Sequence, residues 1–315
     1  MPATEVELDG QYRALREGAG ALERAGRRVI EVGGAEAAEY LQGQLTNEIE
    51  ALAAGEGCYS ALLDRKGHMQ GDMRVLRTGD GFLIETEAVA GDAVLRHLSM
   101  YKIGREVSVG DVSERSALLS VLGPAAAEVA LAGPAGPEHA HRETELGGVA
   151  VTAIATDAGV DLLAAAERAG AVLAALLERG AEPVVEEAAE IIRVEAGRPR
   201  FGREMSTATI PQEAGINDRA ISFSKGCYIG QETVARLHYR GKPNRHLRGL
   251  RLSAPAAAGD PVRLGERELG TVGTAVLSPA RGPIALAILR REGELGATVS
   301  VGDGVEAELV DLPFG

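Results

Sequence analysis

The segment that lies between two regions of different sequence pattern reads Lys225-Gly226-Cys227-Tyr228-Ile229-Gly230-Gln231-Glu232. A lysine stands two positions before its cysteine, and a nearby ammonium would favour the reactive thiolate. A buried structural cysteine at a tight turn is the competing interpretation. The only other cysteine, Cys58, is far away in the sequence and precedes Tyr59 in a predicted strand, so we expect it in the core. The chain therefore has neither a disulfide framework nor a Cys-x-x-Cys metal site.

On the N-terminal side of this segment, predicted helices and strands alternate. Strands are expected at 29–32, 59–63, 69–76, 82–86, 107–109, 117–122, 149–155 and 160–163, and helices at 35–44, 89–101, 167–178 and 184–196. The Gly-Asp-Gly turn at 79–81 indicates a meander of short strands. From about Arg248 the pattern changes to short apolar runs punctuated by Gly and Pro, which is typical of a small antiparallel barrel. The fold class is therefore α+β with a C-terminal β module.

Composition sets the broad class. The chain has 315 residues, of which 45% are hydrophobic and 25% are charged, as in soluble globular proteins, and this length favours two or three subdomains. No apolar run approaches the roughly 18 residues of a membrane span. The first twenty residues are mixed with charges and show no secretory signal, so the cytoplasm is the expected compartment.

Charge is distributed unevenly. The net charge of −13 argues against a general nucleic-acid binder. Residues 224–248 are the exception, because they carry six basic side chains against the single acid Glu232. Such a stretch can hold a polyanion, or its arginines can pair with acids of the surrounding surface.

Glu195 is a candidate binding residue. In the predicted helix 184–196 it shares a face with Ala188 and Ile191, so the apolar stripe ends in a partly buried carboxylate. Gly197 is a plausible helix stop, and the negative end of the helix dipole disfavours a second negative charge there. An arginine fork, or the amine and ring N–H edge of a pterin, would satisfy this carboxylate. The alternative is an internal salt bridge to Arg193, Arg198 or Arg203.

Asp72 is a second candidate. It follows a Gly-containing turn at 64–71 and enters a predicted strand, either as a solvent-facing edge residue or as a pocket carboxylate. His139 and His141 form a His-x-His pair without further ligands nearby, so we assign no metal site. The common phosphate-loop, dinucleotide-binding and serine-hydrolase motifs are absent from the sequence.

Six separate segments resemble one family. They are Leu41-Gln42-Gly43-Gln44-Leu45-Thr46-Asn47, the turn ending in Asp72, Tyr101-Lys102-Ile103, residues 193–202 (Arg-Val-Glu-Ala-Gly-Arg-Pro-Arg-Phe-Gly), Ile210-Pro211-Gln212-Glu213, and Lys225 to Glu232 continuing to Arg236. In order and spacing they resemble YgfZ-type folate-binding proteins, which are relatives of the glycine-cleavage T-protein, an aminomethyltransferase. The resemblance spans about residues 10 to 250, and the last segment is specific for the YgfZ branch.

This resemblance implies a three-domain, ring-like T-protein fold with tetrahydrofolate in a central cavity. We expect residues 1–245 to form the folate-binding region from two interleaved α+β subdomains, and 246–315 to form the barrel. Members of the YgfZ branch support assembly or repair of iron-sulfur enzymes, including the radical enzyme that thiomethylates tRNA. The implied function is a tetrahydrofolate-binding accessory protein with iron-sulfur client or assembly proteins as partners. The alternative is a folate-dependent aminomethyltransferase or another one-carbon transferase, and the net charge disfavours direct tRNA binding.

The resemblance also implies site roles. Glu195 would hold the pterin edge, Asp72 would lie near the reactive nitrogens of the folate, and Cys227 would be the functional thiol. Arg236 and its neighbours would face the anionic glutamate tail, and Tyr101 and Tyr228 would contact the cofactor. Two departures stand out: Glu48 replaces the Asp that often follows Thr-Asn, and Gln70-Gly71-Asp72 replaces the Asp-Asp pair common in T-proteins. The second departure removes a carboxylate that could steer proton transfer.

Overall fold

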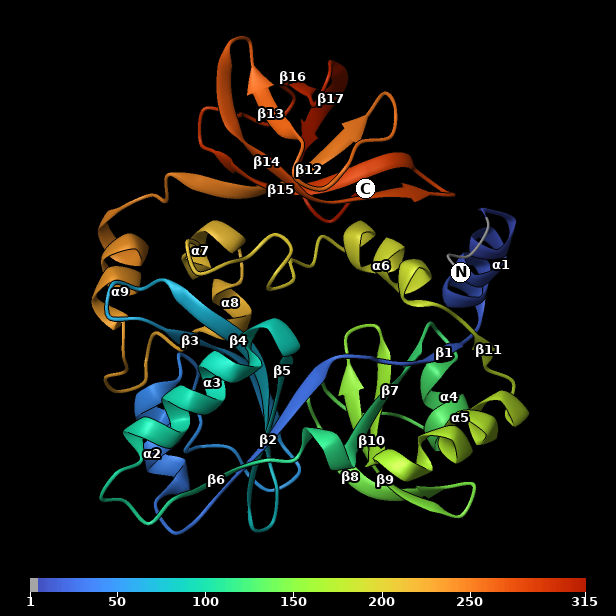
Figure 1. Ribbon diagram of the computed structural model, residues 1–315, viewed down its shortest axis with the longest axis vertical. Helices are drawn as coiled ribbons and strands as arrows, with labels where there is room; N and C mark the ends of the chain where they lie inside the picture. Colours follow the sequence, from blue (N-terminus) through green and yellow to red (C-terminus); the bar gives the residue numbers. More distant parts are fainter. Residues whose placement is uncertain (1–4) are drawn as a thin grey trace. The chain divides into compact units, whose positions relative to one another are not determined.

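A computed structural model describes residues 5–315, which form two compact units (Figure 1). The first unit contains the described residues up to Leu62 together with Gly71–Ala189 and Arg219–Ile229. The second contains Leu63–Gln70, Glu190–Asp218 and Gly230–Gly315. Each unit is thus assembled from segments that are distant in the sequence.

A five-stranded sheet carries part of the first unit. Its order is β3-β4-β5-β2-β6, with β2 at Arg27–Gly33, β3 at Gly57–Leu63, β4 at Met69–Arg77, β5 at Gly81–Glu87 and β6 at Ser108–Asp111. The helices α2 (Ala37–Gln44) and α3 (Ala88–Tyr101) pack on it. The predicted meander is confirmed, since β3, β4 and β5 are consecutive neighbours, and Thr78 N donates to Gly81 O (2.9 Å) at the predicted turn.

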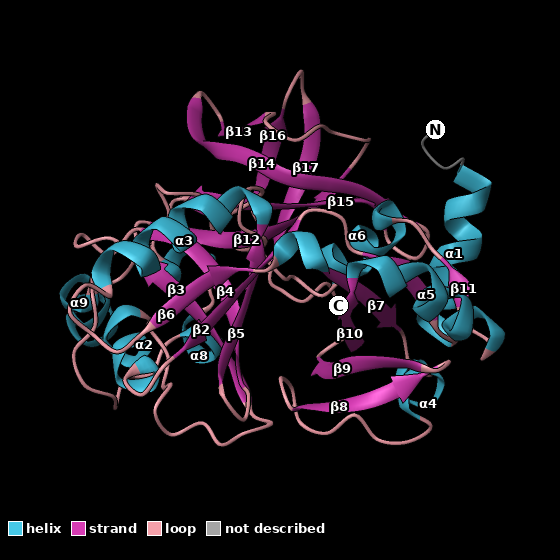
Figure 2. Ribbon diagram, turned by 60° about the horizontal axis from the view of Figure 1, so that its bottom comes forward, coloured by secondary structure: helices cyan, strands magenta, loops and turns pink. Residues whose placement is uncertain are grey.

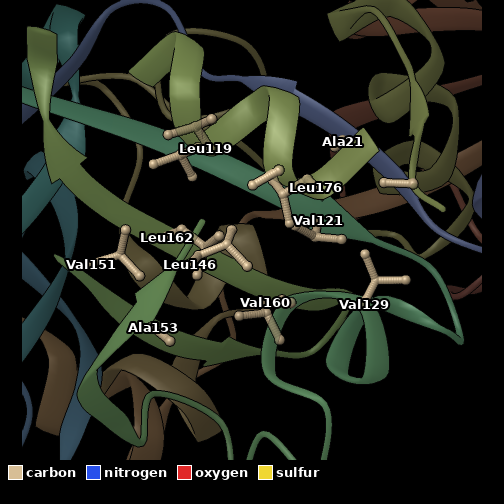
Figure 3. Close-up of a cluster of buried hydrophobic side chains, with 14 of the residues drawn as sticks. Ala21, Leu119, Val121, Val129, Leu146, Val151, Ala153, Val160, Leu162 and Leu176 are labelled. Atoms are coloured by element: carbon tan, nitrogen blue, oxygen red, sulfur yellow. The ribbon is translucent and has the colours of Figure 1, made fainter. Parts of the chain in front are cut away.

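A six-stranded sheet forms the rest of the first unit's β structure. Its order is β11-β1-β7-β10-β9-β8, with β1 at Gly20–Glu23, β7 at Ser116–Leu122, β8 at His141–Leu146, β9 at Val149–Thr156, β10 at Gly159–Ala165 and β11 at Glu182–Pro183. The helices α4 (Ala126–Leu131) and α5 (Ala169–Glu178) contact it, and α1 (Glu5–Glu17) packs near β1. Figure 3 shows the core between these elements, where Leu119, Val160, Leu162 and Leu176 are all at 0% exposure. This core is built from Ala, Val and Leu, as the shortage of aromatic residues requires.

The second unit contains a closed antiparallel barrel. Its strands follow the order β12-β15-β14-β13-β16-β17, with β12 at Arg245–Leu252, β13 at Pro261–Leu264, β14 at Arg267–Ser278, β15 at Gly282–Arg290, β16 at Thr298–Val301 and β17 at Val305–Val310. Figure 2 shows these strands in magenta. The predicted C-terminal antiparallel barrel is therefore confirmed, because the short alternating runs place one face of each strand in a shared interior.

Short helices connect these parts of the chain. They are α6 (Glu186–Glu195), α7 (Pro211–Ala214), α8 (Asn217–Ala220) and α9 (Gln231–Arg240). The division between the units falls within α6 and α8. Within the second unit, α7 contacts both β12 and α9.

Some of these elements were not expected. The helix α9 is not predicted from the sequence, and only Val234 among its ten residues is buried. The predicted domain division at 245/246 stays a prediction. No helix within the described residues has the length and apolar character needed to cross a membrane.

Candidate functional site

Asp72 lies near the start of β4 and is a buried acid with an unusual titration. Asp72 is 8% exposed, and Tyr59 Oη donates to its Oδ2 (2.5 Å) from the neighbouring strand β3. Burial is the largest influence and raises the pKa of Asp72 to about 6, although the Tyr59 hydrogen bond and the charge of Arg27 act in the opposite direction. The carboxyl group therefore exchanges its proton close to neutral pH.

The charged residues around Asp72 are already paired with one another. Arg27 binds both Glu85 and Glu87, and Arg74 binds Glu85 (3.3 Å) and Asp161 (2.8 Å). These arginines lower the pKa of Glu85 against the effect of burial, with Arg27 contributing more than Arg74. Asp72 differs from these acids because its hydrogen-bond donor is a neutral phenol rather than a guanidinium.

Glu195 is the last residue of α6, in the second unit. It is 5% exposed, so its predicted burial is confirmed, and Ser278 Oγ donates to its Oε1 from the end of β14. Gly197 has a φ of +66°, which ends the helix as predicted. Arg193, one of the arginines considered as its salt-bridge partner, instead binds Glu190 (2.8 Å) and Glu204 (3.1 Å).

Lys225, considered above as a charge that would favour the Cys227 thiolate, binds backbone oxygens instead. Its Nζ donates to three backbone oxygens, those of Gln42 (2.7 Å), Leu45 (2.8 Å) and Asn47 (2.6 Å). These three bonds use all the donors of an ammonium group, so Lys225 is directed at the end of α2. Burial lowers the pKa of Lys225 to about 8. The thiol of Cys227 itself is exposed, which contradicts the alternative of a buried structural cysteine.

Further hydrogen bonds join residues 219–222, which precede Lys225, to Thr46 and Asn47. Thr46 Oγ1 donates to Ala220 O (2.6 Å), Asn47 Nδ2 donates to Arg219 O (2.9 Å), and Ser222 N donates to Thr46 O (3.0 Å). Thr46 and Asn47, which end the segment 41–47, thus stabilise the first unit through these hydrogen bonds. They anchor the chain just before Cys227.

Cys58 lies near this anchor. It is partly buried rather than fully buried in the core, and burial raises the pKa of its thiol to about 12 although the charge of Lys225 acts to lower it. The ammonium that was expected to influence Cys227 therefore influences the other cysteine. Cys58 stays protonated at neutral pH.

The second glycine of the Lys225–Glu232 segment, Gly230, has a steric role. Gly230 has a φ of +85°, and a Cβ there would lie 2.5 Å from Asp64 O in the turn that precedes β4. Both residues belong to the second unit, so this close approach packs the start of α9 on that turn. Gly226 differs, since a Cβ there would meet nothing within 4 Å.

The remaining predicted residues lie in different surroundings. Tyr228 is 7% exposed, and its ring lies 5.4 Å from Lys225 Nζ. Tyr101 is 45% exposed and stacks on His97 with ring centroids 4.4 Å apart. Arg236 is exposed on α9. Asp72, Tyr101, Cys227 and Tyr228 belong to the first unit, and Glu195 and Arg236 belong to the second.

Sequence reasoning missed Tyr59 and Ser278, which donate hydrogen bonds to the two candidate carboxylates. A signal existed for Tyr59, because the turn 64–68 lies midway between it and Asp72, and the register of the predicted hairpin makes them neighbours. No comparable signal links Ser278 to Glu195, which is 83 positions away.

Comparison with solved structures shows the fold. The crystal structure of the glycine cleavage system aminomethyltransferase T from Bartonella henselae superimposes with a TM-score of 0.89 over 100% of this chain and 91% of that one, at 23% sequence identity. The chain therefore has the mixed α+β T-protein fold.

The relatives found by comparison with known sequences include aminomethyltransferases and a YgfZ protein. An aminomethyltransferase from Rubrobacter xylanophilus is 29% identical over 100% of this chain and 88% of the relative, and one from Saccharopolyspora erythraea is 30% identical over 100% and 91%. The tRNA-modifying protein YgfZ from Serratia proteamaculans is 33% identical over 80% of this chain and 78% of the relative. The model of the GCVT N-terminal domain matches residues 5–225. The chain therefore belongs to the GCVT N-terminal domain family.

Proposed function

We propose that this protein binds tetrahydrofolate and transfers a one-carbon unit to it, as a folate-dependent transferase of the aminomethyltransferase type. The family is a tetrahydrofolate-binding one, and relatives named aminomethyltransferase match the whole of this chain. These relatives support transfer chemistry more than they support the accessory role that the Lys225–Glu232 segment favours. Tetrahydrofolate would supply the nitrogen that accepts the one-carbon unit.

The observation that carries this proposal is the buried carboxyl group of Asp72, which is 8% exposed and accepts from Tyr59 Oη (2.5 Å). A general acid or base works best when its pKa lies near the working pH, and burial brings the pKa of Asp72 to about 6. Its hydrogen-bond donor, Tyr59, orients the carboxyl group without adding a positive charge. Asp72 would therefore take up a proton from the reacting nitrogen, even though the second carboxylate common in T-proteins is absent.

The chain also offers a residue suited to the pterin. A carboxylate accepts two parallel N–H donors, and Glu195 presents one that is 5% exposed at the end of a helix. Ser278 fixes its orientation. Tyr101 and Tyr228 would add aromatic contacts, and Arg236 would pair with the anionic glutamate tail.

A pH profile tests the role of Asp72. With tetrahydrofolate and a lipoyl-bound aminomethyl donor, the single-turnover rate of the wild type should rise with pH and level off above about 6. In Tyr59→Phe the loss of a hydrogen bond that lowers the pKa of Asp72 should move this rise upward by about one pH unit. If the wild type and Tyr59→Phe had the same pH–rate profile, Asp72 would not be the group whose protonation controls the rate.

Calorimetric titration of tetrahydrofolate tests the binding residue separately. We expect saturable binding to the wild type, a loss of about tenfold or more in Glu195→Ala, and unchanged binding in Glu187→Ala, an exposed acid of the same helix. Absence of binding to the wild type would refute the folate proposal.

A second candidate function rests on Cys227. Its exposed thiol, in a segment specific for the YgfZ branch, favours the accessory role in iron-sulfur enzyme maintenance. The relative named tRNA-modifying protein YgfZ supports it. Under this hypothesis Cys227→Ala abolishes support of an iron-sulfur enzyme in cells, whereas Cys58→Ala does not. Under the transferase hypothesis Cys227→Ala keeps the wild-type transfer rate.

A further inference from the structure

The second unit contains a cavity of about 400 Å³ beside the barrel strands β12, β14 and β15. Arg203, Arg245 and Arg290 line it, together with hydroxyl-bearing side chains such as Ser206 and Thr271. Its volume lies in the range of small-molecule sites. It shares no residue with the candidate folate and thiol residues described above.

Two of these arginines are forced together by the barrel. Arg245 on β12 pairs directly with Arg290 on β15 in the antiparallel register. Like charges in directly opposed positions destabilise a sheet. Arg245 and Arg290 are thus an electrostatically unfavourable pair in the wall of this cavity.

The surrounding acids compensate only part of this charge. Arg245 is bound by both oxygens of Glu213 (2.9 and 2.8 Å). Arg203 and Arg290 form no ion pair within residues 5–315, and Glu292, the acid near Arg290, is bound to Arg267 (2.7 Å).

Of the acids that line the cavity, Glu268 is exposed, and Glu204 is engaged through one carboxylate oxygen while its buried Oε1 has no hydrogen-bond partner among the described residues. Glu204 Oε2 accepts from Arg193 Nη1 (3.1 Å) and Arg200 N (2.9 Å), and Glu268 lies 3.8 Å from Arg263. Two guanidinium groups with free forks therefore remain at the cavity, Arg203 and Arg290, both of them exposed to solvent.

We propose that this cavity is a binding site for a small dianion, a phosphate monoester or a dicarboxylate. A guanidinium fork binds either group through two parallel N–H donors, and two free forks match two negative charges. Bound anion would also relieve the repulsion between Arg245 and Arg290.

Calorimetric titration with inorganic phosphate and with succinate tests this site. We expect the wild type to bind at least one of them saturably, and the tighter of the two identifies the class of ligand. Arg290→Gln and Arg203→Gln should each weaken that binding by about tenfold or more, since hydrogen bonds to charged groups are lost. Arg251→Gln is the matched control, because Arg251 is an exposed arginine of β12 that does not line the cavity.

Thermal unfolding separates a binding role from a structural one. Without an added anion, Arg290→Gln should unfold at the same or a higher temperature than the wild type, because the opposed charges are gone. With the anion, the wild type alone should gain in unfolding temperature. No binding of either anion up to about 10 mM, or equal binding by the wild type and both lining variants, would overturn the proposal. Neither outcome depends on tetrahydrofolate.

Discussion

Asp72 and Glu195 are both acids withdrawn from water, yet their surroundings differ. Asp72 lies within a sheet where Arg27, Glu85 and Glu87 are paired with one another, and its own donor is the phenol of Tyr59. Glu195 ends a helix and accepts from an aliphatic hydroxyl, that of Ser278. Similar burial therefore accompanies two different proposed roles, which are proton exchange for Asp72 and recognition of N–H donors for Glu195.

The largest expected effect is a loss of transfer rate in an Asp72 variant, in contrast to a loss of tetrahydrofolate affinity in a Glu195 variant. Asp72→Asn keeps the shape of the side chain but cannot exchange a proton, so we expect the single-turnover transfer rate to fall by about 10²–10⁴ with little change in tetrahydrofolate affinity. Glu195→Gln should do the reverse, weakening affinity more than rate. Rapid-quench kinetics and calorimetry on both variants measure the two quantities. If both substitutions changed only affinity, the contrast between the two acids would disappear.

The next effect concerns stability. The pKa of Asp72 is about 6 in the folded protein and 3.8 for an unperturbed Asp, so the folded state binds more protons between these values and loses stability as pH rises through them. Asp72→Asn removes this loss. The variant should exceed the wild type by about 3 kcal/mol in the free energy of unfolding at pH 7, with no such gain near pH 3.5.

Urea unfolding at the two pH values measures this difference. Asp80→Asn, at an exposed position in the turn between β4 and β5, is the control and should unfold like the wild type. A gain for Asp72→Asn that is equal at both pH values would mean that the titration of Asp72 is not its cause.

The smallest effect comes from the two hydroxyl donors. Tyr59→Phe and Ser278→Ala each remove one hydrogen bond to a buried carboxylate and should lower the free energy of unfolding by about 1–3 kcal/mol. Ser300→Ala on β16, which removes a hydroxyl from the same barrel, should change it by less than about 0.5 kcal/mol. Equal losses in all three variants would show that neither donor is specifically coupled to its acid.

The sequence was enough to predict the structural features that arise from local patterns of residues. The alternating runs after Arg248 predicted the barrel, and the face shared by Ala188, Ile191 and Glu195 predicted a buried acid at the end of a helix. Each of these features depends on residues a few positions apart, whose burial follows from helix or strand periodicity.

The remaining features depend on pairing across the chain. Lys225 was considered as a neighbour of the Cys227 thiol because the two are only two positions apart in sequence, but its acceptors lie 178 to 183 positions away. The pKa of Asp72 likewise depends on its burial and on the charge of Arg27, a residue of β2 that only the assembled sheet brings near. Residues that become neighbours only when the chain folds produce no periodic pattern in the sequence.

The bonds from Lys225 to the end of α2 have a consequence for the order of folding during synthesis. Before residue 225 leaves the ribosome, the carbonyl groups of Gln42, Leu45 and Asn47 lack this partner, and residues 219–229 of the first unit are still missing. Contacts of such high separation form late. The first unit is therefore completed only after most of the chain has been made, and the loop that carries Cys227 is among its last parts to be fixed.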